Sequence, residues 1–345
     1  MTGGATVRSN FNTARIGSQD VSLDCNTGGK NCPAKIPMGQ VRLPECNDIL
    51  VRGPIAIVLN TSATNATRHN LCSEIEKRFA SRNITARLLI TRTAAELPQL
   101  AANAASQAVE AVIAAGGDGT VSTIAGSLAH GSIPLGILPL GNLNHFAKDL
   151  RIPLDLESAI DTITAGKTTP VDIASVNGIH FVNNSSLGLY PMIVRYREMQ
   201  QRRGLRKWQA FVRAVLIAFR RYPFFQVQVT MNGQTLVRAT PFAFVGNNMY
   251  QVEGLRIGSR SSLTGGLLCL YIVHGLGRLG LLRTCVDALL GRLHRRANFD
   301  FLRAAELRID LEQPQITVAR DGELTTLMPP LAYRIHPRAL QVIAP

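Results

Sequence analysis

The chain has 345 residues, of which 46% are apolar, so it can form one large domain or two ordinary ones with a sizeable core. It has no run of about 20 uncharged apolar residues and no apolar stretch of signal-peptide type at its start, so we expect a cytoplasmic protein without a membrane-spanning helix. The net charge of +14 favours anionic partners, but no basic-aromatic ladder or other nucleic-acid motif is present, and nucleic acid is not an expected partner.

Residues 1–50 differ in composition from the rest of the chain. They are rich in Gly, Asn, Thr and Pro and show no apolar period, which predicts a flexible N-terminal extension. Beyond them, short apolar runs alternate with helical stretches. Strands are predicted at 55–59, 84–90, 111–115 and 133–138, with helices at 69–81, 94–108 and 121–129. This alternation predicts a doubly wound, three-layer α/β domain, in which a parallel sheet has helices on both faces.

After about residue 166 the pattern becomes one of strands and tight turns. Asn177-Gly178 and Asn232-Gly233 stand between strand-like runs and predict hairpin turns. Strands are predicted at 171–176, 179–182, 225–231, 242–245, 267–273, 307–311 and 316–319. The second half of the chain is therefore expected to be an antiparallel β domain with two inserted helices.

A glycine-rich loop, Gly116-Gly117-Asp118-Gly119-Thr120, follows the third predicted strand and opens a helix. Glycines let the backbone approach a ligand, and the amides at the start of a helix favour phosphate. Asp118 beside a phosphate implies Mg²⁺ or a proton-accepting role, because carboxylate and phosphate repel each other unless a cation lies between them. The alternative is a tight strand-to-helix turn with Asp118 as the helix cap.

A second polar loop, residues 139–150, follows the fourth predicted strand and contains Gly141, Asn142 and Asn144. Because the carboxyl ends of parallel strands share one sheet edge, these residues should lie near the glycine-rich loop. Their amides can bind a nucleotide edge or a phosphate. The alternative is that Asn142 or Asn144 caps the helix that follows.

A third polar segment, Asp321-Gly322-Glu323, comes late in the chain after a predicted strand. One carboxylate could accept the proton of a substrate hydroxyl while the other helps to hold Mg²⁺. Taken alone, however, the segment is more typical of an ordinary Asp-Gly hairpin turn with solvated charges.

Together the three segments resemble the diacylglycerol kinase catalytic-domain family, which includes the sphingosine and ceramide kinases and bacterial soluble lipid kinases. The resemblance covers about residues 53–345. It is carried by GGDGT at 116–120, PLGNLNHFAKDL at 139–150, VDIASVNGIHFVNNSSLGLYP at 171–191 and ARDGE at 319–323. GGDGT alone is shared with NAD kinases and phosphofructokinases, whereas the second and last segments point to lipid kinases.

The resemblance implies an α/β ATP-binding domain of residues 51–168, which residues 332–345 rejoin, and a β-sandwich lipid-substrate domain of residues 169–331. ATP and Mg²⁺ are the implied cofactors. Asp321 is the implied general base, and the catalytic residues Asp118 and Glu323 are the implied Mg²⁺ ligands. The implied nucleotide-binding residues are Asn60, Ser62, Gly116, Gly117, Asp118, Gly119, Thr120, Gly141, Asn142 and Asn144.

Three positions depart from the family pattern. Many relatives have Thr where this chain has Asn142, so a hydroxyl contact to the nucleotide is absent. Gly265 stands where many have an Asp that holds a second, structural Mg²⁺, and glycine has no side chain to ligate a metal. His145 replaces an Asp that is common at the same place in the second loop.

Residues 204–222 form a basic helical segment with an apolar stripe. The stripe contains Trp208, Phe211, Val212, Val215, Leu216 and Phe219. We expect this stripe, Trp208 included, to pack on the protein core, as most amphipathic helices do. The alternative is an interfacial helix on anionic lipid, since arginines surround the stripe, and both roles can coexist.

The cysteines and histidines do not predict a site of their own. The cysteines are Cys25, Cys32, Cys46, Cys72, Cys269 and Cys285. None forms a C-x-x-C pair, so thiols in a reducing compartment are favoured over a metal or redox site. None of the seven histidines has metal-ligand spacing to another, so the sequence does not predict a histidine metal site.

The sequence therefore predicts a lipid kinase, peripherally associated with anionic membranes, that transfers the ATP γ-phosphate to the hydroxyl of a diacylglycerol-like lipid. Two alternatives stay open. One is a kinase of a soluble acceptor such as NAD, and the other is a non-catalytic nucleotide-binding protein that docks on acidic membranes. The oligomeric state is also open, with a homodimer as one alternative.

Overall fold

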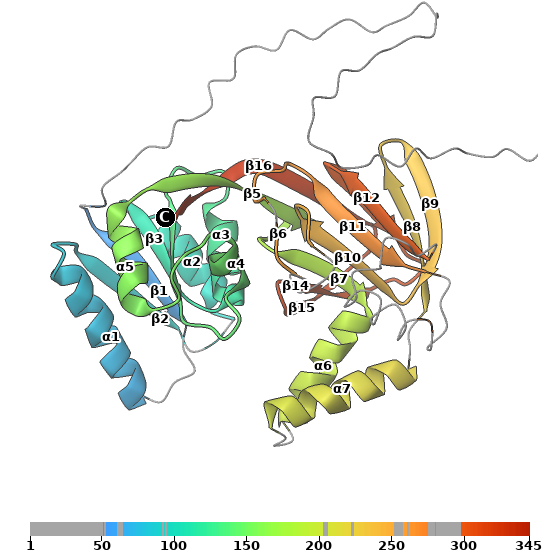
Figure 1. Ribbon diagram of the computed structural model, residues 1–345, viewed down its shortest axis with the longest axis horizontal. Helices are drawn as coiled ribbons and strands as arrows, with labels where there is room; N and C mark the ends of the chain where they lie inside the picture. The colour runs from blue at the N-terminus through green and yellow to red at the C-terminus, as the bar shows by residue number, and fades with distance from the viewer. Residues whose placement is uncertain are drawn as a thin grey trace, which may run out of the picture. The chain divides into compact units, whose positions relative to one another are not determined.

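Two apolar cores, joined by two long strands, organise the chain in the computed structural model (Figure 1). The structure describes residues 51, 53–60, 65–91, 93, 95–202, 206–221, 224–251, 258–260, 262–274, 280 and 298–345, all within one compact unit that spans Glu45–Pro345. The predicted N-terminal extension of residues 1–50 lies outside the described residues.

The first core surrounds a parallel sheet with the strand order β2-β1-β3-β4. Its strands are β1 (Ile55–Asn60), β2 (Ala86–Thr91), β3 (Ala111–Gly116) and β4 (Leu135–Pro139), and its helices are α1 (Asn65–Ala80), α2 (Leu97–Ala105), α3 (Asp118–Leu128), α4 (His145–Asp149) and α5 (Leu156–Ala165). Helix α1 contacts α5, whereas α2 contacts α3, so helices cover both faces (Figure 1). Covered on both faces, β3 is apolar and buried along its whole length. The predicted doubly wound α/β fold is confirmed.

The strand order predicts where along the carboxyl edge of the parallel sheet a ligand would bind. The chain passes from β1 outward to β2 and then back across β1 to β3. Right-handed crossovers put α1 on one face of the sheet and α2 and α3 on the other. The direction of winding therefore reverses between β1 and β3, and ligands of open α/β sheets bind where it reverses, at the carboxyl ends of the strands. These ends are Asn60 and Gly116.

The second core lies between two antiparallel layers, and the predicted β-sandwich-like fold is confirmed. One layer has the order β12-β11-β10-β7-β14-β15, and the other contains β16-β13-β8-β9. These strands are β7 (Asn184–Gly188), β8 (Phe225–Met231), β9 (Gln234–Thr240), β10 (Phe242–Asn247), β11 (Leu268–Val273), β12 (Phe299–Ala304), β13 (Glu306–Asp310), β14 (Ile316–Arg320), β15 (Glu323–Leu327) and β16 (Leu331–Ile343). Strand β8 shows the alternation of a sheet with one buried face, because Phe225, Val227 and Val229 point into the core.

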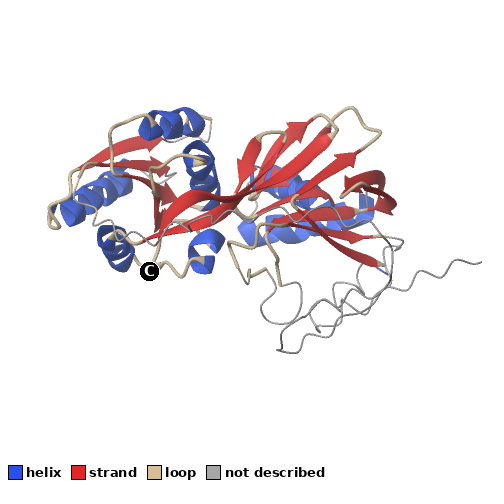
Figure 2. Cartoon of the chain, turned by 90° about the horizontal axis from the view of Figure 1, so that it is seen from above, coloured by secondary structure: helices blue, strands red, loops and turns tan. Residues whose placement is uncertain are grey.

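Strands β16 and β5 (Thr168–Val176) run from one core to the other within a single sheet (Figure 2). In β16, Tyr333 belongs to the second core and Val342 to the first. Val342 also pairs with Leu135 of β4, so the end of the chain completes the parallel sheet. The pairing of β5 with β16 shifts register between His336 and Leu340, which marks a bulge where the strand changes cores.

The predicted hairpin turns are also confirmed. Asn177-Gly178 joins β5 to β6 (Ile179–Phe181), and Asn232-Gly233 joins β8 to β9. All four residues have positive φ, between 47° and 79°. Type I′ turns require positive φ at both central positions, which Asn and Gly tolerate.

Helices α6 (Leu189–Arg202) and α7 (Lys207–Arg221) pack against each other. In α7 the buried residues are Ala210 and Ala214, whereas Trp208 is 73% exposed and Leu216 is 60% exposed. The expectation that the apolar stripe packs on the core is therefore wrong for four of its residues, because the small residues on the opposite face make the contact. The four exposed residues are Trp208, Phe211, Val212 and Leu216. Among the described residues, no helix has the length and apolar character needed to span a bilayer.

We predict that Val342→Ala lowers the free energy of unfolding by about 2 kcal/mol, because it removes buried methyl groups where β16 closes the parallel sheet. Val237 on β9 is a matched control, since it is 55% exposed while Val342 is fully buried. Val237→Ala should change stability by less than about 0.5 kcal/mol in the same urea titration. Equal effects of the two substitutions would contradict the assigned role of Val342.

Candidate active site

The glycine-rich loop presents an open helix start at the end of β3. Gly117 is the N-cap of α3 and has no side chain that could cap the first amides. These amides have no intrahelical partner and lie at the positive end of the helix dipole, so they suit an anion. Gly116 is required by the tight turn, because a Cβ there would lie 2.6 Å from Thr120 Oγ1. The alternative that Asp118 caps its own helix is wrong, since α3 has no side-chain cap.

Three strand ends meet at this loop. Asn60, at the end of β1, donates from Nδ2 to Thr120 Oγ1 at 3.0 Å. The Leu140 amide, after β4, donates to the Gly116 carbonyl at 3.0 Å. A Cβ on Gly141 would lie 2.5 Å from the Cα of Gly117, so the two loops touch through their backbones. Ser62, also predicted to bind nucleotide, lies outside the described residues.

Asn144 shapes the second loop from within. Its φ is 49° and its side chain is buried. Its Oδ1 accepts from the Gly141 amide at 3.1 Å, while its Nδ2 donates to the carbonyls of Pro139 at 3.1 Å and Gly141 at 2.8 Å. It is the N-cap residue of α4 but makes no side-chain cap, so its amide fixes the loop instead. Asn142 is exposed, and contacts of both residues with a nucleotide stay predictions.

Asp118 links the two loops. Its Oδ1 accepts a hydrogen bond from the Phe146 amide, in the first turn of α4, at 3.2 Å. The carboxylate is therefore held at the junction of the loops, beside the start of α3. His145, which begins α4, is exposed.

Asp321 comes from the other core and is partly buried against α3. Asp321-Gly322 is a left-handed turn between β14 and β15, as a hairpin requires. The predicted hairpin is therefore correct, but the expectation of solvated charges is wrong for Asp321. Its Oδ1 accepts from the amides of Asn183 at 2.8 Å and Asn184 at 2.9 Å.

The second carboxylate oxygen of Asp321 carries two further donors. The Val182 amide donates to Oδ2 at 2.8 Å, and the Ser122 hydroxyl of α3 donates to the same oxygen. Burial raises the pKa of Asp321, and the hydrogen bonds from Ser122 and the three amides oppose that rise only in part. A raised pKa makes the carboxylate a stronger base. Of the four donors, the hydroxyl of Ser122 is the one that can rotate away.

Glu323 reaches the glycine-rich loop from the opposite side of the same hairpin. A Cβ on Gly119 would collide with Oε1 of Glu323, so the Glu323 carboxylate lies directly over Gly119, the residue that follows Asp118 in the chain. Carboxylate oxygens are ligands that Mg²⁺ prefers. Asp118 and Glu323 therefore offer the type of ligand atom that suits the implied ion.

Arg260 is a site residue that sequence reasoning missed. Its side chain is fully buried and forms an ion pair with Asp149 of α4, with Nε and Oδ2 2.7 Å apart. It also donates to the Val182 carbonyl at 2.6 Å and to Asn183 Oδ1 at 2.9 Å. It thus ties the second loop to the segment that holds Asp321. Arg260 belongs to no motif, so only the structure could assign it.

Gly265 lies beside a group of buried polar side chains. A Cβ there would lie 2.8 Å from Asn248 Oδ1, a buried atom without a hydrogen-bond partner among the described residues. Nearby, the buried carboxylate of Asp172 accepts from Asn248 Nδ2 at 3.0 Å, from the Gly266 amide at 2.7 Å and from the Arg338 amide at 2.8 Å. These three donors fix the orientation of the Asp172 side chain.

Two of the six cysteines are described. Cys72 and Cys269 are buried thiols. Burial raises the pKa of Cys269 to about 11, so its reactive thiolate form is scarce near neutral pH. Cys25, Cys32, Cys46 and Cys285 lie outside the described residues.

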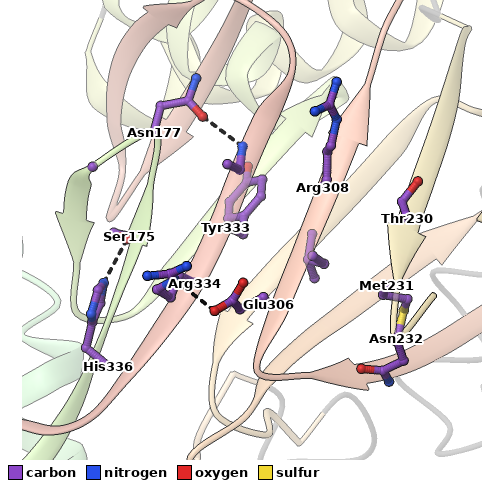
Figure 3. A pocket seen from close by; sticks show the side chains of 13 residues that line it. Ser175, Asn177, Thr230, Met231, Asn232, Glu306, Arg308, Tyr333, Arg334 and His336 are labelled. Carbon is purple, nitrogen blue, oxygen red and sulfur yellow. Dashed lines mark hydrogen bonds and ion pairs between the residues drawn. The ribbon is translucent and has the colours of Figure 1, made fainter. Parts of the chain in front are cut away.

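A pocket of about 520 Å³ lies on the sheet formed by β5, β16, β13 and β8 (Figure 3). Its lining side chains pair with one another: Ser175 with His336 at 2.9 Å, and Arg334 with Glu306 at 3.0 Å. None of the predicted nucleotide-binding residues lines it. The pocket therefore lies apart from the candidate active site.

Curated relatives and a solved structure resemble the chain. A protein of Yersinia pestis named "Probable lipid kinase YegS-like" is 37% identical over 121 residues, which cover 33% of this chain and 40% of that protein. An uncharacterized protein of Synechocystis is 27% identical over 241 residues, which cover 68% of this chain and 54% of that protein. The chain thus spans about half the length, or less, of these curated relatives. The crystal structure of a diacylglycerol kinase from Bacillus anthracis shares the fold, with a TM-score of 0.62, 21% identity, and 86% of this chain and 97% of that chain covered.

Two family models match successive parts of the chain. One, described as the diacylglycerol kinase catalytic domain, matches residues 54–176, which carry both glycine-containing loops. The other, described as the YegS C-terminal NAD kinase beta sandwich-like domain, matches residues 193–344, which carry Asp321 and Glu323. The chain belongs to the family of proteins that join a diacylglycerol kinase catalytic domain to a YegS C-terminal domain.

Proposed function

We propose that this protein is an ATP-dependent lipid kinase that phosphorylates the hydroxyl of a diacylglycerol-like lipid. One observation carries the proposal. The hairpin of Asp321 and Glu323 is brought onto the first turns of α3, so that a partly buried carboxylate with four hydrogen-bond donors and a second acidic group face the glycine-rich loop. A candidate base, a candidate metal-binding pair and a phosphate cradle therefore meet at one place.

The proposed reaction is an in-line phosphoryl transfer. The oxygen of the acceptor hydroxyl forms a bond to the γ-phosphorus of ATP, and the bond from that phosphorus to the bridging oxygen breaks, so that ADP leaves. The proton of the hydroxyl passes to Asp321. Since Ser122 donates to Oδ2 of Asp321, the acceptor hydroxyl would take the place of the Ser122 hydroxyl on that oxygen.

The remaining residues bind and orient. The amides at the start of α3 and in the second loop would hold the phosphates, with Asn60 and Asn144 fixing the loops. Asp118 and Glu323 would hold Mg²⁺, which when bound offsets the negative charge of the phosphate oxygens. Catalysis of this kind is mainly positioning and charge neutralisation.

A partly apolar pocket supports a lipid as the acceptor. It has a volume of about 310 Å³ and lies between α6 and the start of β14. It is lined by Met192, Tyr196, Phe225 and Ile316 together with the polar residues Arg195, Gln313 and Thr317. Strand β14 runs from this pocket to Asp321, a distance of about 16 Å for five extended residues. An acyl chain seated there would have its polar end directed along the strand toward the candidate base.

The exposed face of α7 supports docking on an anionic membrane. Trp208 stacks on Phe211 with ring centroids 5.7 Å apart, and both are exposed together with Val212 and Leu216. Exposed arginines flank this face: Arg206, Arg213 and Arg220. An apolar helical face with a basic border complements the interface of a bilayer that contains anionic lipid.

A soluble acceptor is the second candidate, because the C-terminal family model is described as NAD kinase beta sandwich-like. NAD therefore belongs in the acceptor panel beside diacylglycerol and related lipids. Labelled phosphate on NAD and on no lipid would favour this candidate over the lipid kinase.

We predict that Asp321→Asn lowers kcat/KM for lipid phosphorylation by about 10²–10⁴-fold, because the amide cannot take the hydroxyl proton. In the wild type, kcat/KM should fall as pH is lowered through the pKa of Asp321, which burial raises. ATP binding, measured by calorimetry, should change little. Equal phosphorylated-lipid signals from both proteins, with labelled ATP and mixed lipids, would reject Asp321 as the base.

We predict that Asn144→Gly weakens ATP binding by about 10–100-fold, because three hydrogen bonds that shape the second loop are lost. Glycine tolerates the positive φ of this position, so the substitution removes the side chain without adding backbone strain. Asn83→Gly is the matched control, since Asn83 is exposed and has a φ of 59° in a turn after α1. The same ATP affinity in both variants would show that the loop does not depend on Asn144.

We predict that the double substitution Trp208→Glu and Leu216→Glu lowers binding to vesicles of phosphatidylcholine and phosphatidylglycerol by at least about tenfold in a flotation assay. The double substitution Val237→Glu and Met328→Glu introduces the same two charges at positions outside α7 that are 55% and 69% exposed, and it should bind like the wild type. Undiminished binding of the double variant would rule out α7 as the docking face.

A further inference from the structure

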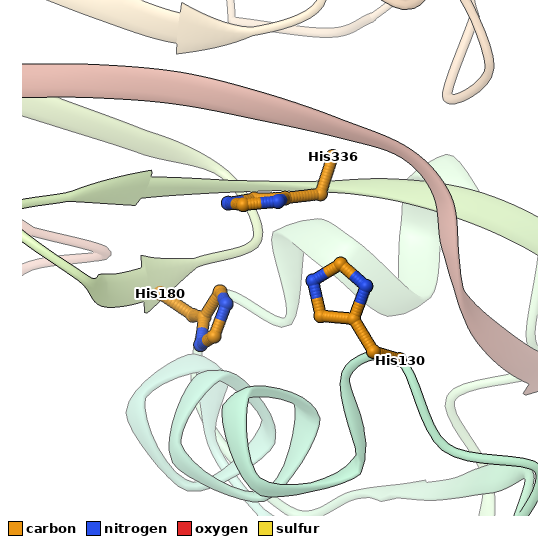
Figure 4. Close-up of side chains that lie close together, drawn as sticks. All are labelled: His130, His180 and His336. Carbon is orange, nitrogen blue, oxygen red and sulfur yellow. The ribbon is translucent and has the colours of Figure 1, made fainter.

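Three histidines far apart in the sequence converge at one place, contrary to the expectation drawn from their spacing. His130, His180 and His336 each offer a ring nitrogen, and these atoms all lie within 4.8 Å of one another. The ring centroids are 4.9 Å apart for His130 and His336, 5.4 Å for His180 and His336, and 6.2 Å for His130 and His180 (Figure 4). Sequence spacing missed the cluster because each ring comes from a different element.

The backbone of each histidine is fixed by a separate contact. His130 follows α3 with a φ of 65°, and its amide donates to the Ala339 carbonyl, in the bulge of β16, at 2.7 Å. His180 on β6 lies against α3, since a Cβ placed on Gly126 of α3 would be 3.3 Å from the Cβ of His180. His336 stands where the register of β16 shifts. The three rings are therefore brought together by the folding of both cores and not by a flexible loop.

One of the three rings is oriented by a hydroxyl group. Ser175 Oγ lies 2.9 Å from His336 Nε2, which leaves Nδ1 of that ring as the nitrogen for a ligand. His180 and His336 are partly buried, whereas His130 is exposed, so an ion could enter the cluster from solvent on the side of His130.

We propose that His130, His180 and His336 form a binding site for a divalent transition-metal ion of the Zn²⁺ class. Three imidazoles without a carboxylate favour such an ion over Mg²⁺ or Ca²⁺, which prefer oxygen ligands. Tetrahedral Zn²⁺ with nitrogen at about 2.1 Å separates its ligand atoms by about 3.4 Å. The observed limit of 4.8 Å therefore requires only small movements of the rings. A fourth position stays open to water.

The ion would act as a clamp between elements of both cores. His130 belongs to the α/β core side, at the end of α3, whereas His180 and His336 belong to the strands that lead into the sandwich. Binding to the folded state alone raises stability by mass action. The site is distinct from Asp118 and Glu323, and the proposal does not depend on the lipid kinase activity.

The test uses the full chain, stripped with a chelator and dialysed against Zn²⁺, with bound metal measured by elemental analysis. Wild type and His69→Asn, a control at an exposed position of α1, should bind one equivalent more than His130→Asn. Asparagine tolerates the positive φ of residue 130, so the variant should fold. The affinity of His130→Asn for Zn²⁺ should be lower than that of the wild type by more than about 100-fold. Loss of a residue that only hydrogen-bonds to a ligand lowers metal affinity by roughly 10–100-fold, so a larger loss indicates a direct ligand. His336→Gln is the second variant, and circular dichroism checks both.

Two spectroscopic and thermal measurements separate this site from cysteine ligands elsewhere in the chain. Co²⁺ in the wild type should give the visible d–d bands of a tetrahedral ion without thiolate-to-metal bands. Zn²⁺ at a hundredfold excess over Kd should raise the Tm by about 4 °C in the wild type and not in the variants. No metal bound by the wild type, equal affinity in wild type and cluster variants, or a thiolate-dominated Co²⁺ spectrum would overturn the proposal and leave the three rings as aromatic side chains in edge-on and tilted contact.

Discussion

The partly buried carboxylate of Asp321 is the constraint on which the candidate active site depends. Removing an ionised group from water without partners is very costly, and here three backbone amides and the Ser122 hydroxyl offset that cost. Three of these donors are the amides of residues 182–184, from the end of β6 to the first residue of β7, and the fourth lies on α3. The carboxylate therefore fixes the sandwich against α3. Its stabilising contacts and its proposed role as a base use the same oxygen atoms.

A second link, through the backbone, makes that contact possible. Because β5 and β16 pass from one core into the other, one layer of the sandwich belongs to the same ten-stranded sheet as β3, the strand that precedes the glycine-rich loop. Arg260 and Asp149 add a buried ion pair between α4 and the segment that holds Asp321. Breaking such a pair is costly because one charge stays buried without its partner. The candidate active site is thus held together by strands that are shared between the two cores and by the buried ion pair of Arg260 and Asp149.

The local parts of this arrangement could be predicted from the sequence, whereas the contacts between the parts could not. Apolar runs ending in Asn60 and in Gly116 predict strands and their polar ends, because period and turn chemistry are local properties. The Asp321-Gly322 turn was predicted as a hairpin, yet its burial depends on a helix about two hundred positions earlier. Ser122 had a local signal, since it lies four residues after Asp118 on the same helix face. Arg260 and the three histidines had none. The prediction that the apolar stripe of α7 is buried was wrong for another reason. An exposed apolar face and a buried apolar face have the same helical period, so the sequence pattern does not distinguish them.

Helix α3 connects the two sites that the structure contains. Its 11 residues span about 16 Å from the glycine-rich loop to the turn of His130. The helix dipole favours an anion at its first turn and a cation at its last. Phosphate at Gly117–Thr120 and a metal ion at the histidine cluster each match the end at which they would bind, and Asp321 contacts the helix between them through Ser122. A movement of α3 toward either ligand would therefore shift Ser122 relative to the Asp321 carboxylate, which is the group whose position the proposed transfer needs most.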